Sequence, residues 1–162
     1  MTDLPIASVN DTRWLDAAQQ QAWRSFLGGT TVLMDRLDRD LRSEHGLSMS
    51  EYEILVRLSE APDRSIRMAD LAAALSHSRS RITHTISRLE RDGIVVRTQC
   101  GTDGRGVTAV LTDKGFELLA TAAHTHVRGV RDYLVDQCSD EDLQATKRVM
   151  DAIQAALGGR TF

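Results

Sequence analysis

The sequence predicts a mainly α-helical fold with one small β-hairpin, on three observations. Most of the chain places apolar residues three and four positions apart, which gathers them on one face of a helix. Two short runs rich in β-branched residues, 94–99 and 107–111, flank the glycine-rich segment CGTDGRG, as the strands of a hairpin would. Helical segments make up about two-thirds of the chain, against about one-third in an average globular protein.

The first expected helix runs from about Asp11 to Glu44. The helical pattern runs through Trp23, Phe26, Thr30, Leu33, Leu37 and Leu41, which the spacing places on one face. Gly28-Gly29 interrupts this pattern, and each glycine costs about 1 kcal/mol relative to alanine in a helix. The pair therefore predicts a kink, a close packing contact or a break into two helices. Gly46 is expected to end the segment.

A second helix is expected to begin at Ser50, because Ser50 and Glu53 have the spacing of a capping box. Its apolar positions are Tyr52, Leu55, Val56 and Leu58. Pro62 stops the run, since proline cannot continue a helix.

The stretch from 71 to 97 reads as two short helices joined by a tight turn. The apolar residues of the first are Leu71, Ala72 and Leu75, and those of the second are Ile82, Ile86 and Leu89. The polar break Ser76-His77-Ser78 separates them, so the two helices must cross steeply, as in a helix-turn-helix. Asp92-Gly93 ends the second helix, and the hairpin that follows makes the predicted unit a winged helix-turn-helix.

Two more helices are expected at the carboxyl end. Thr112 caps a long helix that reaches about Gln137, and Ser139 caps the last one, whose first turn is acidic. The apolar positions of the long helix are Phe116, Leu119, Ala123, Val127, Val130 and Leu134, and those of the last are Leu143, Met150, Ile153 and Leu157. These stripes exceed what the central unit can cover, so we expect packing against a second copy of the chain.

The chain is therefore divided into three parts. Residues 1–47 form an arm and a dimerisation helix, residues 48–112 the winged helix-turn-helix, and residues 113–162 the carboxyl-terminal dimerisation helices.

Positive charge is concentrated in the central part, although the whole chain carries −3. Residues 64–114 contain nine Lys/Arg and five Asp/Glu, whereas residues 1–63 contain six and eleven. Opposite the apolar face, the helix after the turn carries Arg79, Ser80, Thr83, His84, Ser87 and Arg88, with no acidic residue between Asp70 and Glu90. Arginine and hydroxyl side chains suit base edges in a major groove, and Ser78 at the helix start suits a phosphate. The expected partner is double-stranded DNA.

The hairpin loop holds Asp103-Gly104-Arg105. An arginine on a projecting loop can enter a narrow minor groove, where the potential is most negative. Asp103 could hold the Arg105 guanidinium in place through a charge-assisted hydrogen bond.

Residues 50–115 resemble the MarR family of bacterial regulators. The matching motifs are LAxxL at 71–75, the SxSxxT run at Ser78, Ser80 and Thr83, RLERDGIVVR at 88–97, Asp103-x-Arg105 and LTDKG at 111–115. The resemblance implies a triangular homodimer that presents one winged helix to each half of a palindromic operator. It assigns recognition-helix positions to Ser78, Arg79, Ser80, Thr83, His84 and Arg88, and the wing motif to Asp103 and Arg105.

Such a resemblance also implies a repressor that a small, often aromatic, ligand or oxidation releases. The family's pocket lies between the dimerisation helices and the DNA-binding unit, so Trp14, Trp23 and Tyr52 are candidates to line it. They can equally be core or interface aromatics. Cys100 is the better candidate for an oxidation switch, although two reduced thiols, Cys100 and Cys138, are the simpler interpretation.

Other function classes find little support. The sequence lacks GxSxG and GxxxxGK[ST], and His124 and His126 point in different directions on a helix, so no enzyme, metal or cofactor site is expected. The amino-terminal stretch lacks signal-peptide character and no stretch suits a membrane span, so a cytoplasmic location without membrane contact is expected. A winged-helix module that binds protein instead of DNA remains the alternative.

Overall fold

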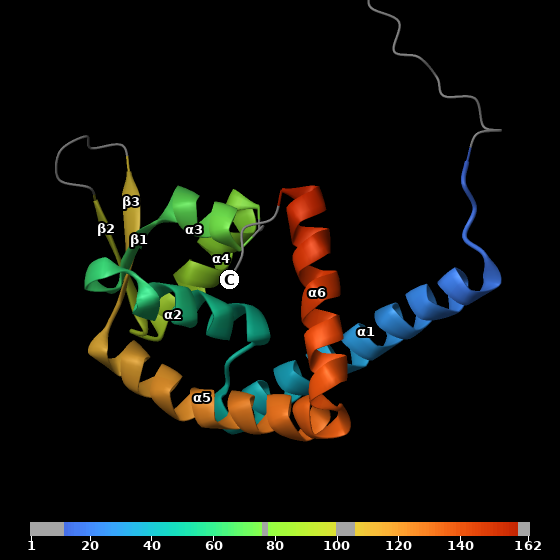
Figure 1. The fold of residues 1–162 in the computed structure, drawn as a ribbon. Helices are drawn as coiled ribbons and strands as arrows, with labels where there is room; N and C mark the ends of the chain where they lie inside the picture. Colours follow the sequence, from blue (N-terminus) through green and yellow to red (C-terminus); the bar gives the residue numbers. More distant parts are fainter. Residues whose placement is uncertain (1–11, 76–77, 100–105, 159–162) are drawn as a thin grey trace, which may run out of the picture.

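The computed structural model describes residues 12–75, 78–99 and 106–158, and within them it confirms a mainly helical fold with a winged helix-turn-helix (Figure 1). Single 3-10 turns at Pro62–Arg64 and Val135–Gln137 join some of the elements. The helices are α1 (Ala17–His45), α2 (Met49–Glu60), α3 (Met68–Ala74), α4 (Arg79–Arg91), α5 (Asp113–Tyr133) and α6 (Asp140–Leu157), and the strands are β1 (Ser65–Arg67), β2 (Val95–Gln99) and β3 (Val107–Leu111).

The strands form an antiparallel sheet of order β1-β3-β2. The expected hairpin pairs Val95 with Leu111 and Gln99 with Val107. On its other side β3 pairs with β1, where Ser65 lies opposite Val110. The sequence did not predict β1, because three residues are too short for an alternating pattern and this strand depends on its pairing with β3.

The core of the central unit lies between α2, α3, α4 and the sheet. The predicted apolar face of α4 is fully enclosed, since Ile82, Ile86 and Leu89 are at most 2% exposed. From the neighbouring helices, this core receives Ile54, Leu55, Leu58, Leu71 and Ala72. Burial of such side chains contributes about 1.5–3 kcal/mol each, so the steep crossing of α3 and α4 is fixed mainly by packing.

Two helix starts differ from the prediction. The helix α2 is capped by Ser48 and Glu51, not by Ser50 and Glu53, and all the reciprocal capping-box bonds involve Ser48 and Glu51. Both pairs have the same spacing, and the tertiary structure selects the first because Glu51 is buried at that point. The helix α1 begins at Ala17 instead of Asp11, with Asp16 as its cap.

Two further helix features bear on the prediction. The helix α1 runs without a break through Gly28-Gly29, so of the three predicted alternatives only the break into two helices is excluded. The helix α5 ends at Tyr133, and a 3-10 turn occupies the residues up to Gln137. Its expected apolar stripe mixes two faces: Phe116 and Val127 are exposed, and the residues that α5 buries are Gly115, Leu119, Ala122, Thr125 and Gly129.

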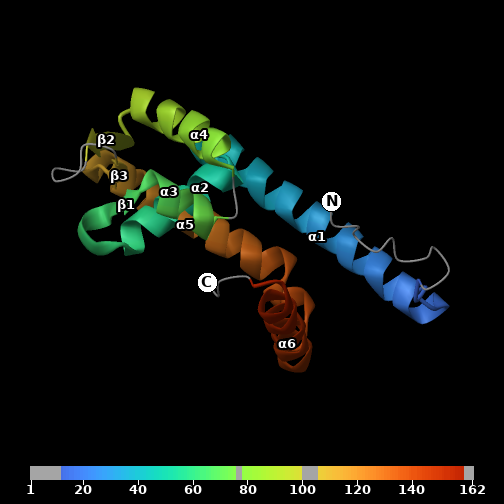
Figure 2. The same cartoon turned by 90° about the horizontal axis from the view of Figure 1, so that it is seen from above.

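The terminal helices extend well beyond the central unit (Figures 1 and 2). α1 packs along α5, and Gly129 permits this approach, since a Cβ there would lie 2.8 Å from a methyl group of Leu37. Before Leu37, none of the described residues of α1 is buried, and the described part of α6 buries none either. Large apolar side chains on these helices therefore face outward in the single chain.

The LTDKG motif joins the hairpin to α5. Thr112 caps α5 by accepting a hydrogen bond from the Gly115 N–H, and its hydroxyl can donate to the carbonyl of Gly93 or Ile94. Lys114 Nζ donates to the carbonyl of Asp92 at 2.7 Å. At Gly115 a Cβ would lie 2.2 Å from the Ile94 carbonyl oxygen, so this position accepts only glycine without a backbone shift.

We expect Gly115→Ala to lower the free energy of unfolding by about 1–3 kcal/mol, the usual cost of overpacking. Urea unfolding at a fixed protein concentration measures this. Glu117→Ala, at an exposed position of the same helix, should change stability by less than about 0.5 kcal/mol. Equal stabilities for the two variants would contradict the close approach of α5 to the hairpin.

Candidate nucleic-acid interface

The helix α4 separates its apolar and polar residues onto opposite faces. Ser78 caps it by accepting a hydrogen bond from the Arg81 N–H, so the helix begins where the sequence predicted. While Ile82, Ile86 and Leu89 face the core, the side chains of Arg79, Ser80, Thr83 and His84 are exposed. Seen from above, α4 lies at the edge of the molecule (Figure 2). These four side chains and Ser78 are therefore accessible to a large partner.

A concavity of about 370 Å³ lies beside this face, between α3, α4 and the hairpin. Its lining includes three arginines from three elements, Arg67 of β1, Arg79 of α4 and Arg97 of β2, and no acidic side chain. The sequence analysis missed Arg67 because it did not predict β1, and it placed Arg97 in a predicted strand without assigning it a contact. Arg97 is already paired, since its guanidinium donates to the Glu90 carboxylate through Nε at 2.9 Å and through Nη2. That pairing holds the pKa of Glu90 below its usual value.

The predicted wing residues Asp103 and Arg105, like Cys100, lie outside the described residues. The described ends of the hairpin meet at the pair Gln99 and Val107, and Gly106 and Val107 line the concavity. The base of the predicted wing and the exposed face of α4 thus border one hollow.

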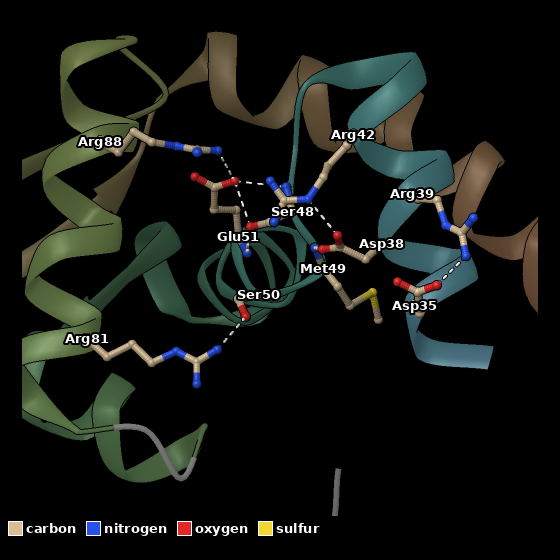
Figure 3. Close-up of polar contacts among 10 residues, drawn as sticks. All are labelled: Asp35, Asp38, Arg39, Arg42, Ser48, Met49, Ser50, Glu51, Arg81 and Arg88. Atoms are coloured by element: carbon tan, nitrogen blue, oxygen red, sulfur yellow. Dashed lines mark hydrogen bonds and ion pairs between the residues drawn. The ribbon is translucent and has the colours of Figure 1, made fainter. Parts of the chain in front are cut away.

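Arg88 has a different environment from the other predicted contact residues. Its Nη2 forms an ion pair with Glu51 of α2, whose side chain is only 2% exposed (Figure 3). Arg81, one α4 position that the sequence analysis did not select, donates to Ser50 Oγ at 3.1 Å. Of these three arginines of α4, Arg79 lines the hollow, whereas Arg81 and Arg88 are bonded to residues of α2.

A second cavity, of about 320 Å³, lies between α2 and α5. Tyr52 and His126 line it with their ring centroids 4.6 Å apart, and His126 Nδ1 is buried with no hydrogen-bond partner among the described residues. Burial lowers the pKa of His126 and raises the pKa of Tyr52. An imidazole nitrogen that lacks a partner can accept or donate one hydrogen bond to a bound molecule.

The three aromatic candidates for a ligand pocket do not come together. Tyr52 lines the cavity between α2 and α5, whereas Trp23 lines an apolar groove between α1 and α6. Trp14 is 85% exposed. The prediction that all three surround one ligand has no support within a single chain.

The described ranges contain no group of three or more metal-ligating side chains. Cys138, within these described ranges, is a free thiol. No helix described there combines the length and the apolar character that a membrane span requires.

Comparison with known proteins agrees with the motifs and the fold. A family model described as MarR family matches residues 45–106. The crystal structure of AbsC, a MarR family regulator from Streptomyces coelicolor, is 41% identical with a TM-score of 0.85, and the match covers 92% of this chain and 100% of AbsC. Sco3205 from the same organism, solved in complex with DNA, is 39% identical with a TM-score of 0.86, covering 89% of this chain and 94% of Sco3205.

Curated relatives match over shorter spans. The regulator PecS of Dickeya dadantii is 34% identical over 110 residues, which are 67% of this chain and 66% of PecS. The transcriptional repressor MprA of Escherichia coli is 29% identical over 87 residues, which are 54% of this chain and 49% of MprA. The chain thus spans about two-thirds of PecS and half of MprA. These relatives are regulators and not enzymes, and the chain belongs to the MarR family of transcriptional regulators.

Proposed function

We propose that this protein binds double-stranded DNA sequence-specifically as a homodimer and represses transcription from a palindromic operator. The observation that carries the proposal is the exposed face of α4 beside a hollow lined by three arginines and no acidic side chain. A major groove admits an α-helix, and its base edges match arginine, serine and threonine. Sco3205, which is similar over most of its length, was solved with DNA, and MprA is named a repressor; both support the proposal.

The two ends of the interface have different roles in this proposal. Arg79, Ser80, Thr83 and His84 face the base edges, whereas Ser78 at the start of α4 and Arg67 beside it face phosphates. Asp103 and Arg105 are proposed to contact the adjacent minor groove. A hollow lined by arginines and by no acidic side chain favours a polyanion such as DNA as the partner.

We expect Arg79→Ala to weaken operator binding by about 1–3 kcal/mol and to relax base preference at one position. The operator is first selected from a pool of random duplexes, and affinity is then measured at several salt concentrations. Arg131→Ala, at the far end of α5, removes a cation without touching the interface and should leave the affinity unchanged. Failure of the wild-type protein to bind any duplex at low salt would refute the DNA-binding function and favour the protein-interaction alternative.

The homodimer is proposed because the terminal helices lack a partner within the chain. An apolar groove of about 420 Å³ runs between the start of α1 and α6, lined by Leu15, Ala22, Trp23, Phe26, Val149 and Ile153 among others. Val32 and Leu157 add exposed apolar surface at 69% and 81%. At Gly28 and Gly29 a Cβ would meet nothing within 4 Å, and a second backbone packed closely against α1 would explain two glycines in a continuous helix.

Ile153→Glu should shift the protein from dimer toward monomer, because it places a charge in the apolar groove between α1 and α6. Light scattering at micromolar concentration distinguishes a chain mass of 17.9 kDa from twice that value. Gln144→Glu adds the same charge to the exposed face of α6 that carries the Lys147–Asp151 pair, and it should remain dimeric. A wild-type monomer under these conditions would rule out the homodimer.

We also propose that a small aromatic molecule regulates the protein by entering the cavity between α2 and α5. The volume of about 320 Å³ lies within the range typical of small-molecule sites, and Glu53, Arg57 and Glu60 line the cavity besides Tyr52 and His126. Tyr52 offers a ring for stacking, and His126 Nδ1 offers an unused hydrogen-bonding atom.

The redox alternative through Cys100 predicts loss of operator binding on oxidation in the wild type but not in Cys100→Ser.

The buried imidazole predicts a pH dependence of stability. Because burial lowers the pKa of His126, the folded chain keeps it neutral where the unfolded chain, with a pKa of about 6.5, is protonated. Stability from this group is therefore lost as the pH falls from above about 6.5 toward the lowered pKa. Urea midpoints at about pH 8 and pH 5.5 should differ less in His126→Phe than in the wild type. His84→Gln removes an exposed imidazole and should keep the wild-type difference.

A further inference from the structure

Polar side chains hold the amino-terminal turn of α2 to two other helices (Figure 3). We call this set the α2 junction. It consists of Asp38 and Arg42 from α1, Ser48, Met49, Ser50 and Glu51 at the start of α2, and Arg81 and Arg88 from α4. Its contacts join the long helix α1 to the exposed helix α4 through α2.

Asp38 makes the contact with α1. Its Oδ1 accepts a hydrogen bond from the Met49 N–H at 2.8 Å, one of the backbone donors that a helix start leaves without a partner. Arg42 Nε donates to the other oxygen of Asp38 at 2.5 Å. Partial burial opposes ionisation of Asp38, but these two hydrogen bonds hold its pKa below the usual value. The carboxylate therefore stays charged at the start of α2.

Glu51 makes the first contact with α4. Its Oε2 accepts hydrogen bonds from the backbone N–H and the hydroxyl of Ser48, both at 2.8 Å, and pairs with Arg88. A buried carboxylate without a counter-charge destabilises the fold, so the free energy of folding favours the pairing of Arg88 with Glu51. The Arg88 side chain keeps 41% of its surface exposed, but turning its guanidinium toward DNA would weaken the pairing with the buried carboxylate.

Arg81 makes the second contact, by donating to Ser50 Oγ at 3.1 Å. Arg81 and Arg88 are seven residues apart, about two turns of a helix, and so share one face of α4. Burial of Ile82, Ile86 and Leu89 sets the overall position of α4, and two polar contacts along one face of the helix limit its remaining rotation about its axis. The direction in which Arg79 and Thr83 point is thereby fixed relative to α2.

We propose that Arg81 and Arg88 are positioning residues, which orient the exposed face of α4 through Ser50 and Glu51 and do not themselves contact DNA. The inference rests on the proposed function, since the oriented face is the one that would bind DNA. It assigns Arg88 a role different from the one that the family resemblance implies.

Glu51→Gln separates the two roles by the sign of its effect. Gln retains the capping box with Ser48 but removes the charge that holds Arg88. If Arg88 positions α4, operator affinity should fall about threefold or more, because the charged pair becomes a weaker neutral contact. If Arg88 contacts phosphate, freeing it and removing an anion should raise affinity, and that result would overturn the proposal.

The double variant Glu51→Gln/Arg88→Gln supplies a second measurement. Arg88→Gln alone leaves a buried charge and can unfold the chain, whereas the double variant removes both charges and should retain its wild-type circular dichroism. We expect operator affinity about tenfold below wild type, with the same slope of log affinity against log salt concentration. A slope whose magnitude is smaller by about 0.9 would indicate a lost phosphate contact and would overturn the proposal. An affinity equal to that of the wild type would also overturn it.

Ser50→Ala tests the other contact from a residue that is not on α4. It should weaken binding a few-fold with no change of slope, because no cation is removed. Arg67→Gln, the control at a proposed phosphate contact, should lower both affinity and slope. If the wild-type protein binds no duplex, the proposed function fails; if it binds but Ser50→Ala and Glu51→Gln bind as tightly as wild type, the positioning role alone fails.

Discussion

Burial of one face of α4 is the constraint on which the rest of the structure depends. α2, α3 and the sheet enclose Ile82, Ile86 and Leu89, so burial of these side chains favours one position of the helix. The opposite face must then point outward with its short hydroxyl side chains and Arg79. An amphipathic helix in this position buries none of its own polar side chains, since those of α4 are exposed or half-buried.

Polar contacts at two places complete the positioning of α4. At the amino-terminal end of α2, Glu51 and Ser50 hold the side of α4 that carries Arg88 and Arg81. At the carboxyl end of α4, Lys114 donates to the Asp92 carbonyl, and Gly115 allows α5 to approach Ile94 closely. Because the hairpin begins at this same point, α4 and the base of the wing are fixed to one frame and can face the same partner.

The terminal helices connect this frame to the proposed second copy. α1 carries the apolar groove residues Trp23 and Phe26 near its start and Asp38, which holds α2, near its end. In the proposed dimer, one helix therefore contributes both to the subunit interface and to the support of α4. The cavity with Tyr52 and His126 lies on the other side of α2, between α2 and α5, so a molecule bound there would press on the same helix.

The sequence by itself determined the order of the helices, the apolar face of α4, the hairpin and the exposed side chains Arg79, Ser80, Thr83 and His84. Each of these follows from local periodicity, from caps such as Thr112 and Ser139, or from a short motif, and such signals lie within a few residues of one another. Tertiary structure decided the remainder. Two capping boxes of equal spacing were possible, and the burial of Glu51 against Arg88 selected the one at Ser48. The strand β1 exists through its pairing with β3, and the division of the α4 arginines between solvent and α2 depends on contacts between residues more than thirty positions apart, such as Ser50 and Arg81. No local pattern encodes such contacts, because they form only when the helices have already packed.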